Sequence, residues 1–303
     1  MERPVTLFAL GNRHPEPLPP GTVRGQFLRE AFAGGNCDVA VRGQEPAGRA
    51  LLWATKDLET SPGQRFLELA LAAEALLDFF GGAPDLLLPY CDGCRSHRPS
   101  TVRALARSLA ALPVRSIVFF DLHREDILDL LPQKAVHLPT LPLWAQFAEK
   151  LSPPVDWVVA PDLGRARAAA DLAKLLSAGT IALDKGRPEE PLPPEVNGRH
   201  VLLFDDEIVS GRTLQCALGR LGRAGVKSVA IAVSYALCPA TALATLAGEP
   251  SVRALAVGDL IARPAPPCGT VPLAIPLLER FLAIGDEQRA GGIAGTGAAN
   301  GLL

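Results

Sequence analysis

The chain has 303 residues and a formal net charge of −2 at pH 7, so its overall charge gives no indication of a nucleic-acid partner. Hydrophobic residues make up 48% of the sequence, enough for two ordinary cores, and the length favours two domains of roughly 150 residues each. No apolar run approaches the ~20 residues of a membrane span, and the amino terminus lacks a signal-peptide pattern. We therefore expect a cytoplasmic protein without a membrane or nucleic-acid partner.

Apolar runs alternate with segments of helical periodicity along the chain. The runs that we expect to form strands are Val5–Leu10, Ala50–Ala54, Leu86–Pro89, Ser116–Phe120, Trp157–Ala160, Gly179–Leu183, Val201–Phe204, Ser228–Val233 and Ala254–Val257. The segments that we expect to form helices include Gln64–Phe80, Ser100–Leu112, Arg165–Ser177 and Thr213–Ala224. Such alternation predicts an α/β fold with parallel sheets.

The domain boundary is predicted near Ser152-Pro153-Pro154. This divides the chain into an N-terminal domain of residues 1–151 and a C-terminal domain of residues 152–289. Residues 290–303 are mostly glycine and alanine with almost no charge, which is typical of a disordered tail. The proline-rich stretch Lys185–Pro194 is interpreted as a mobile loop within the second domain.

The most informative segment begins with the apolar run Val201–Phe204, which leads directly into Asp205 and Asp206. Two adjacent carboxylates can accept hydrogen bonds from the vicinal hydroxyls of a sugar. The following Ser210–Thr213 turn opens a predicted helix, where backbone amides and the positive helix end favour a phosphate. The segment therefore predicts a sugar-phosphate site. The alternative is a surface Asp-Asp turn that only caps a helix.

Polar residues also follow other predicted strands. Arg95–Arg98 follows Pro89-Tyr90, His123 follows the strand that ends at Phe120, and Asp162 follows Ala160. Ligands in open α/β sheets bind beyond the carboxyl ends of the strands, which favours a site there. His123 and Asp162 could give one nitrogen and one oxygen to Mg²⁺, with water and phosphate completing the shell. Alternatively, each could have a structural role such as packing or capping.

The six cysteines form no disulfide framework, which suits a reducing compartment. Cys91 and Cys94 are separated by two residues after a predicted strand, which permits a redox pair. A zinc site needs four ligands, and although His97 could be a third, the sequence supplies no fourth. The alternative is that both cysteines are incidental small residues in a loop.

The acid pair and the turn after it resemble a known motif. Asp-Asp-x-x-x-(Ser/Thr)-Gly-x-Thr after a hydrophobic strand is similar to the ribose-phosphate loop of type I phosphoribosyltransferases and of ribose-phosphate diphosphokinases. The order and spacing of further segments resemble the second family over roughly residues 5 to 285: Gly11-Asn12, Ser61-Pro62, Glu68-Leu69, Pro89-Tyr90, Arg95–Arg98, Asp121–His123, Pro161–Gly164 and Lys185–Arg187. The resemblance implies two similar phosphoribosyltransferase-type domains, each a mainly parallel sheet flanked by helices.

The resemblance also implies an activity, which is the Mg²⁺-dependent transfer of diphosphate from ATP to ribose 5-phosphate. The products would be 5-phosphoribosyl 1-diphosphate and AMP, and the enzyme would be a homo-oligomer, either a dimer or a hexamer. The implied catalytic residues are Lys185 and Arg187, and the implied metal ligands are His123 and Asp162. The implied ribose 5-phosphate residues are Asp205, Asp206, Val209, Ser210, Gly211, Arg212 and Thr213. The implied nucleotide residues are Phe32, Gly34, Asn36, Arg95, Ser96 and His97.

The sequence departs from the family pattern mainly in the segments that read the nucleotide. The family's Arg-Gln-Asp-Arg is Arg95–Arg98 here, without the amide and the carboxylate, and the Phe-x-Asp-Gly-Glu loop is Phe32–Asn36, without its acids. We therefore expect weaker selection for ATP over other nucleoside triphosphates. In the phosphate loop, Val209 replaces an acid and Arg212 replaces a glycine. Related phosphoribosyltransferase loops accept an arginine at this second position.

Two other functions remain open at this stage. A phosphoribosyltransferase would share the Asp-Asp loop, but it needs only one domain and lacks the loop with Lys185 and Arg187. A non-catalytic family relative would bind nucleotide or sugar phosphate, or regulate an active partner. The drift at Phe32–Asn36 favours this second alternative, whereas the presence of Lys185 opposes it.

Overall fold

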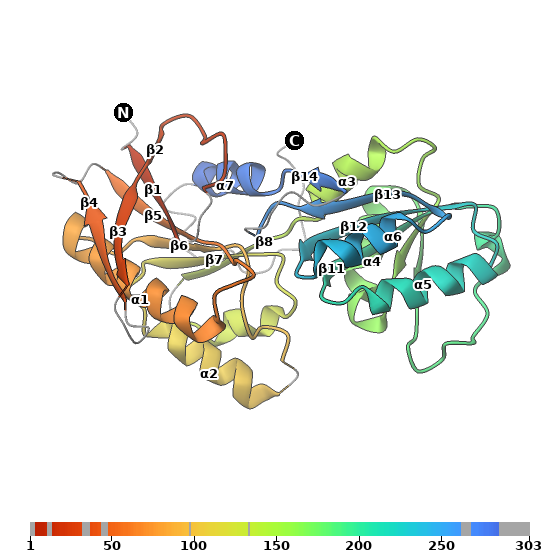
Figure 1. Cartoon of the computed structure of the whole chain (residues 1–303), viewed down its shortest axis with the longest axis horizontal. Helices are drawn as coiled ribbons and strands as arrows, with labels where there is room; N and C mark the ends of the chain where they lie inside the picture. Colours follow the sequence, from red (N-terminus) through yellow and green to blue (C-terminus); the bar gives the residue numbers. More distant parts are fainter. Residues whose placement is uncertain are drawn as a thin grey trace. The chain divides into compact units, whose positions relative to one another are not determined.

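The structure is a computed structural model (Figure 1) that describes residues 4–10, 14–31, 37–43, 48–96, 98–132, 134–261 and 268–284. The chain forms two compact units. The first comprises the described residues through Leu138 together with those from Ala274 onward, and the second comprises Pro139–Leu273. The predicted tail at 290–303 lies outside the described residues.

The first unit is built on a six-stranded parallel sheet. In sheet order its strands are β2 (Thr22–Arg24), β1 (Val5–Leu10), β5 (Arg49–Ala54), β6 (Asp85–Leu88), β7 (Ser116–Phe120) and β8 (Lys134–Leu138). Its helices are α1 (Pro62–Phe80), α2 (Pro99–Ala110), α7 (Ala274–Ala283) and the 3₁₀ helix η1 (Glu125–Leu130). The strands β3 (Gln26–Ala31) and β4 (Cys37–Arg42) form a separate antiparallel pair.

Helix α1 shows how the local sequence sets the fold of this unit. Ser61 caps its start by accepting a hydrogen bond from the Gln64 amide at 3.3 Å, and Gly81 ends it in the left-handed conformation, with φ 65°. Leu69, Ala72, Ala73 and Leu76 recur at helical spacing and are buried. This apolar stripe packs α1 against the sheet and fixes where the loop between β5 and α1 lies.

The second unit repeats this plan with a second six-stranded parallel sheet. In sheet order its strands are β10 (Gly179–Ala182), β9 (Trp157–Ala160), β11 (His200–Ile208), β12 (Ser228–Ala236), β13 (Val252–Gly258) and β14 (Gly269–Val271). Its helices are α3 (Leu141–Glu149), α4 (Ala166–Leu175), α5 (Arg212–Arg223), α6 (Ala240–Ala247) and the 3₁₀ helices η2 (Leu163–Arg165) and η3 (Pro194–Val196).

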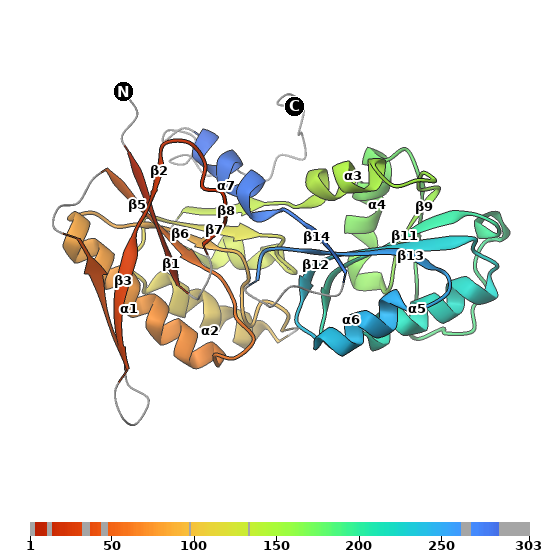
Figure 2. The ribbon, with the colours of Figure 1, turned by 45° about the horizontal axis from the view of Figure 1, so that its top comes forward.

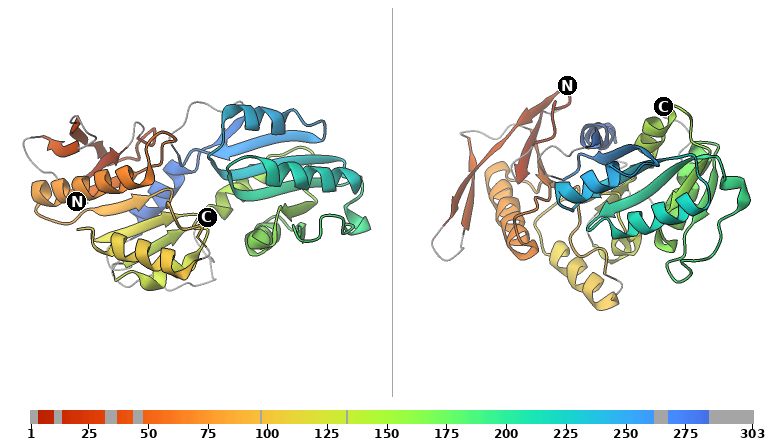
Figure 3. Two further views of the ribbon diagram at one scale, coloured as in Figure 1. Left: turned by 60° about the horizontal axis from the view of Figure 1, so that its bottom comes forward. Right: turned by 45° about the vertical axis from the view of Figure 1, so that its right-hand side comes forward.

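The two units share one topology. In each, the second strand lies at one edge, the first strand comes next, and the remaining four follow in chain order. Helices cover both faces of each sheet: α1 and α2 lie opposite α7, and α5 and α6 lie opposite α3 and α4 (Figure 2; Figure 3). The prediction of two similar, mainly parallel domains flanked by helices is therefore confirmed.

The boundaries of the two units differ from those of the predicted domains. Helix α3 packs against α4, so it belongs to the second unit, although the predicted boundary placed it in the first. Helix α7 belongs to the first unit, where the Arg49 guanidinium lies 5.7 Å from the centre of the Phe281 ring. No helix in the described part of the chain is long and apolar enough to cross a bilayer.

Candidate functional site

The predicted acid pair lies inside strand β11 rather than after it. The strand was expected to end at Phe204, but it continues through Asp205 and Asp206 to Ile208, because its pairing with β12 persists through Ile208 and Ala236. β11 lies inside the sheet between β9 and β12, and helices cover both faces of that sheet (Figure 2). Asp205 and Asp206 are only 6% and 4% exposed.

Arg165 partly compensates the buried acids. One of its guanidinium nitrogens, Nη1, lies 3.7 Å from Oδ2 of Asp206, and the guanidinium carbon lies 5.7 Å from the centre of the Phe204 ring. Arg165 ends η2 and is itself buried. A buried carboxylate requires such a partner, because removing it from water without compensation is costly. Arg165 was predicted only as a helix residue; its position three residues after the strand-end acid Asp162 is the local signal for a larger role.

The environment of Asp205 changes its protonation. Burial raises the pKa of Asp205 to about 8, and the adjacent Asp206 carboxylate acts in the same direction, whereas Arg165 opposes them. At neutral pH Asp205 is therefore mostly protonated, so it can donate a hydrogen bond as well as accept one. Its Oδ1 accepts a hydrogen bond from the Asp206 amide at 2.9 Å. The pair thus offers a donor and several acceptors to a polar ligand.

The turn after β11 opens α5 as predicted. Val209 and Ser210 are exposed, and Gly211 has a left-handed φ of 78°, which any other residue would adopt only with strain. The Arg212 amide donates to Ser210 Oγ at 3.4 Å, while Gly211 has no side chain with which to cap the helix. The turn therefore directs the first-turn amides of α5, including that of Thr213, towards a surface suited to an anion.

Asp162 and Lys185 are brought together in the second unit. They follow β9 and β10, which are adjacent parallel strands, so their carboxyl ends meet at the same edge. Lys185 Nζ lies 2.5 Å from Asp162 Oδ2, and the other carboxylate oxygen accepts a hydrogen bond from the Gly164 amide at 3.0 Å. The lysine side chain is 59% exposed, so this ion pair stabilises the fold by only about 0–1 kcal/mol. A ligand could exchange with it at little cost.

Arg187 lies on the same loop but is not in that pair. Its side chain is 71% exposed, and it lies 3.9 Å from a carboxylate oxygen of Asp184 and 3.7 Å from one of Glu190. These neighbours are within three residues of Arg187 in the sequence. Arg187 is thus an accessible cation on the loop, as the predicted role requires.

Arginines of α5 hold this loop by its backbone. Arg220 is buried and donates hydrogen bonds of 3.0 Å to the carbonyl oxygens of Asp184 and Glu190. Arg223 donates to the carbonyl oxygen of Pro188 at 3.3 Å. The predicted mobile loop is therefore anchored to α5, the helix that begins after Gly211. Arg220 was not among the predicted site residues, although it is a cation on the otherwise apolar face of Leu214, Ala217, Leu218 and Leu221.

The other predicted residues lie in the first unit. His123 is half-buried after β7, and Asp121, two residues earlier, has a left-handed φ of 47°, which is uncommon for residues other than glycine. Arg95 is exposed, and the Ser96 carbonyl accepts a hydrogen bond from Arg124 at 3.1 Å. Arg124 follows His123 in sequence, so the two predicted segments of this unit are close together.

Several predictions fall outside what the structure describes. The predicted nucleotide residues without a described placement are Phe32, Gly34, Asn36 and His97. Across the described residues, no three His, Cys, Asp or Glu side chains form a cluster that could hold a metal ion by themselves. The predicted magnesium ligands are only two, His123 and Asp162, with water and phosphate as the others, so this absence does not test them and the assignment stays a prediction.

In amino-acid sequence, the chain is similar to several ribose-phosphate pyrophosphokinases. No protein-family model matches it. It is 26% identical over 226 residues to a putative ribose-phosphate pyrophosphokinase of Streptomyces coelicolor, covering 71% of each chain. It is 29% identical over 222 residues to the ribose-phosphate pyrophosphokinase of Thermococcus kodakarensis, covering 69% of this chain and 78% of the relative. It is 28% identical over 231 residues to the ribose-phosphate pyrophosphokinase of Pyrococcus furiosus, covering 72% of this chain and 81% of the relative.

One solved structure has the same fold over nearly the whole chain. It is the phosphoribosylpyrophosphate synthetase of Mycobacterium smegmatis, with a TM-score of 0.79 at 23% identity. The match covers 92% of this chain and 97% of that one. The topology of both units is therefore one that a known enzyme also adopts.

The raised pKa of Asp205 predicts how stability changes in Asp205→Asn. In the parent, the unfolded chain ionises near pH 3.8 while the folded chain resists ionisation until about pH 8, so folding stability is lost across that window. The asparagine variant lacks this loss. The melting temperature of the variant minus that of the parent should therefore rise from pH 4.5 to 8 and then level off. Thermal unfolding from pH 4.5 to 9 measures this difference.

The matched control is Asp129→Asn, which removes an exposed carboxylate of η1. Its melting temperature should follow that of the parent across the same series. A difference for Asp205→Asn that stays constant from pH 4.5 to 9 would contradict the raised pKa.

Proposed function

Because the chain is a divergent relative of the ribose-phosphate pyrophosphokinases, which are enzymes, we propose that it transfers the diphosphate group of ATP to ribose 5-phosphate with the help of Mg²⁺. The products are 5-phosphoribosyl 1-diphosphate and AMP. The observation that carries the proposal is the order of groups on one strand and helix of the second unit. Buried acids on β11 are followed by an anion-binding turn at the start of α5.

The acids and the turn match the two ends of ribose 5-phosphate. Asp205 and Asp206 accept hydrogen bonds from the vicinal ring hydroxyls, and a protonated Asp205 also donates one. The amides of Ser210–Thr213 bind the 5-phosphate at the positive end of the 12-residue helix α5. Arg212 is exposed beside this turn and adds a positive charge. The sugar phosphate is thus fixed at both ends, which orients its anomeric hydroxyl.

The transfer step needs positioning and charge neutralisation more than covalent chemistry. The anomeric hydroxyl oxygen forms a bond to the β-phosphorus of ATP and gives up its proton to solvent, the bond from that phosphorus to the α,β-bridging oxygen breaks, and AMP leaves with that oxygen. Lys185 and Arg187 stabilise the charge that develops on the transferred group. The bonds from Arg220 to the loop backbone support this role, because they hold both cations close to the helix that binds the sugar phosphate.

The metal is assigned to His123 and Asp162 on the resemblance and on the chemistry of their side chains. Asp162 presents one carboxylate oxygen that now pairs with Lys185, and a hard cation prefers such an oxygen. When bound, Mg²⁺ neutralises the phosphate oxygens of the nucleotide. If Asp162 exchanged Lys185 for such a cation, the lysine would become available for the diphosphate. The exposure of the Lys185–Asp162 pair supports such an exchange.

A second candidate function is a non-catalytic relative that binds nucleotide and sugar phosphate. The absence of acids in Phe32–Asn36 favours it. The Arg220-anchored loop with Lys185 and Arg187 opposes it, because binding a sugar phosphate alone needs no such loop. We further propose that the protein acts in the cytoplasm as a homo-oligomer, and that it selects ATP over other nucleoside triphosphates only weakly, because Phe32–Asn36 contains no acid.

An assay of AMP release from ATP, ribose 5-phosphate and Mg²⁺ tests the transfer, and Lys185→Ala tests its catalytic group. We expect AMP rather than ADP, formed only when ribose 5-phosphate is present. Lys185→Ala should lower kcat by about 100-fold or more with little change in ribose 5-phosphate affinity. The reason is that the lysine stabilises negative charge that develops on the transferred diphosphate mainly in the transition state. Lys174→Ala on α4, where the lysine is also exposed and ion-paired, is the matched control.

Three other outcomes would each contradict one part of the proposed function. A loss in Lys185→Ala that is confined to KM contradicts the catalytic role of Lys185. ADP as the product contradicts diphosphate transfer. Saturable binding of both ligands without any product supports the non-catalytic alternative.

Asp206→Asn tests the sugar end of the site. An amide replaces a charged acceptor, so the affinity for ribose 5-phosphate should fall by roughly tenfold or more, whereas the affinity for ATP should change little. Calorimetric titration with each ligand separately measures both affinities. Asp171→Asn on the exposed surface of α4 is the control. Equal weakening of the two ligands would place Asp206 away from the sugar.

Variants of the proposed metal ligands test the magnesium assignment. His123→Ala and Asp162→Ala should each need a higher Mg²⁺ concentration for half-maximal AMP release, because each removes a contact to the ion or its water shell. His200→Ala is the control, since His200 bonds to Ser228 at 2.8 Å within the second sheet. Magnesium titrations that coincide with the parent for both variants would show that the ion is bound elsewhere.

A further inference from the structure

Cys91 and Cys94 form a disulfide in a tight turn of the first unit. The turn follows β6, the Cys94 amide donates to the Cys91 carbonyl at 3.3 Å, and the Cα atoms of the two cysteines are 5.7 Å apart. Gly93 between them has a left-handed φ of 86°, which glycine adopts without strain. The backbone of the turn therefore brings the two sulfurs together, and the interpretation of both cysteines as incidental small residues is wrong.

Ion pairs hold this turn independently of the disulfide. Asp92, between the two cysteines, pairs with Lys56 at 2.6 Å and with Arg65 of α1. Lys56 also lies 5.1 Å from the centre of the Tyr90 ring. Both cations come from the β5–α1 region, so Asp92 stays tethered to that region when the sulfur–sulfur bond is broken, while Cys94 and the residues after it lose the restraint of the disulfide. The reduced cysteines would remain within reach of each other, which is what a reversible pair requires.

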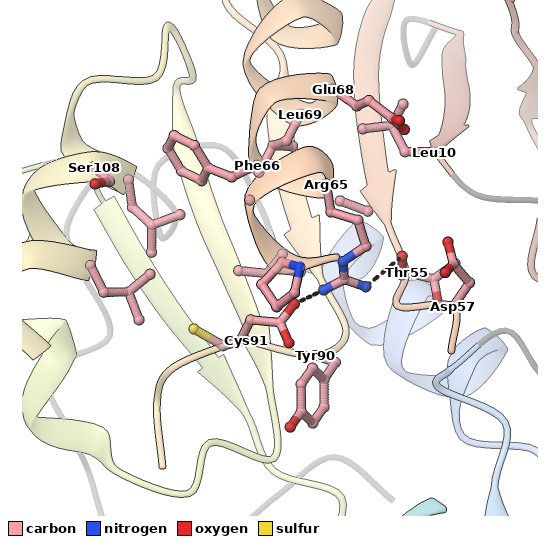
Figure 4. A pocket seen from close by; sticks show the side chains of 17 residues that line it. Leu10, Thr55, Asp57, Arg65, Phe66, Glu68, Leu69, Tyr90, Cys91 and Ser108 are labelled. Carbon is pink, nitrogen blue, oxygen red and sulfur yellow. Dashed lines mark hydrogen bonds and ion pairs between the residues drawn. The ribbon is translucent and has the colours of Figure 1, made fainter. Parts of the chain in front are cut away.

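The two sulfurs differ in their access to solvent. Cys91 is half-buried and lines a cavity of about 290 Å³, together with Arg65, Tyr90 and Asp92 (Figure 4). Cys94 is 4% exposed. In thiol–disulfide exchange an accessible sulfur reacts with the external partner and a protected neighbour completes the reaction. The cavity is close in size to the smallest ligand pockets, so it can admit a small thiol or disulfide.

We propose that Cys91 and Cys94 are a redox-active pair that exchanges with low-molecular-weight thiols and disulfides, and that its oxidation state controls the nucleotide affinity of the segment that follows. On oxidation, the Cys91 thiolate attacks a small disulfide, forms a mixed disulfide and releases one small thiolate. The Cys94 thiolate then attacks the Cys91 sulfur and expels the second small thiolate. Two cysteine protons are lost to solvent or to the released thiolates, and the small disulfide is reduced to two thiols.

The coupling to nucleotide follows from the chain connection and rests on the proposed function. Arg95 directly follows Cys94, and the Ser96 amide donates to the Gly93 carbonyl at 3.2 Å, so the turn sets the start of the predicted nucleotide segment. The disulfide restricts the turn before the ligand arrives, which lowers the entropy cost of binding. Reduction should therefore weaken ATP binding, whereas ribose 5-phosphate binding in the second unit should not change.

The first test counts thiols and needs no enzyme activity. The folded protein is equilibrated with mixtures of reduced and oxidised glutathione, quenched and denatured, and its thiols are titrated. The oxidised protein should show two fewer thiols than the six cysteines of the fully reduced chain, and peptide mapping should find Cys91 joined to Cys94. Cys91→Ser and Cys94→Ser should abolish this step, and Cys216→Ser, which removes an exposed thiol of α5, should retain it.

The second test measures ATP and ribose 5-phosphate affinities by calorimetry in the oxidised and reduced protein. We expect ATP affinity to fall by about three- to fivefold on reduction, which is the effect of freeing one restrained segment. The Cys91→Ser/Cys94→Ser double variant should not respond to reductant. The site is overturned if the parent retains six thiols, or a lasting mixed disulfide at Cys91, under oxidising mixtures. The coupling is overturned if the disulfide forms but ATP affinity is the same in both states. If the protein releases no AMP, only the proposed function is contradicted, because the thiol count and the redox dependence of ATP affinity are both measured without catalysis.

Discussion

The burial of adjacent carboxylates on the central strand β11 is the constraint on which the second unit depends. Asp205 and Asp206 lie where a parallel sheet is covered on both faces, and removing charge from water there costs several kcal/mol without compensation. Two adjustments reduce that cost. Arg165 lies beside Asp206 and over the Phe204 ring, and Asp205 stays protonated at neutral pH. A core position with these costs is best explained by a polar ligand that needs both groups.

Helix α5 links the parts of the proposed site within the second unit. Its first turn follows the exposed Ser210 and the left-handed Gly211, and its buried Arg220, two turns further on, holds the backbone of the loop that carries Lys185 and Arg187. The same loop reaches Asp162 through the lysine. One helix thus sets the distance between the proposed sugar-phosphate turn and the proposed catalytic cations. A shift of α5 would disturb both at once.

The sequence predicted the features that depend on local pattern. Strands β1, β7 and β9 begin and end where the apolar runs do, and α5 opens after the Ser-Gly turn. It could not predict features set by contacts between distant segments. The positions of Arg165 and Arg220 hint at a special role, but their partners, Asp206 and a loop backbone, are known only once the fold brings these segments together. The unit boundary differs because α3 and α7 are assigned by packing rather than by composition. The order and spacing of the strand-end motifs carried the resemblance, which the relatives at 23–29% identity support.

The central claim is that the acid pair and the turn after it bind ribose 5-phosphate. The most direct measurement is titration of the ¹⁵N-labelled protein with ribose 5-phosphate while the backbone amide resonances are followed. We expect saturable shifts concentrated at Asp205, Asp206 and Ser210–Thr213, and much weaker shifts with ribose, which lacks the phosphate. Saturable binding of ribose 5-phosphate that leaves the Ser210–Thr213 amides unmoved would contradict it.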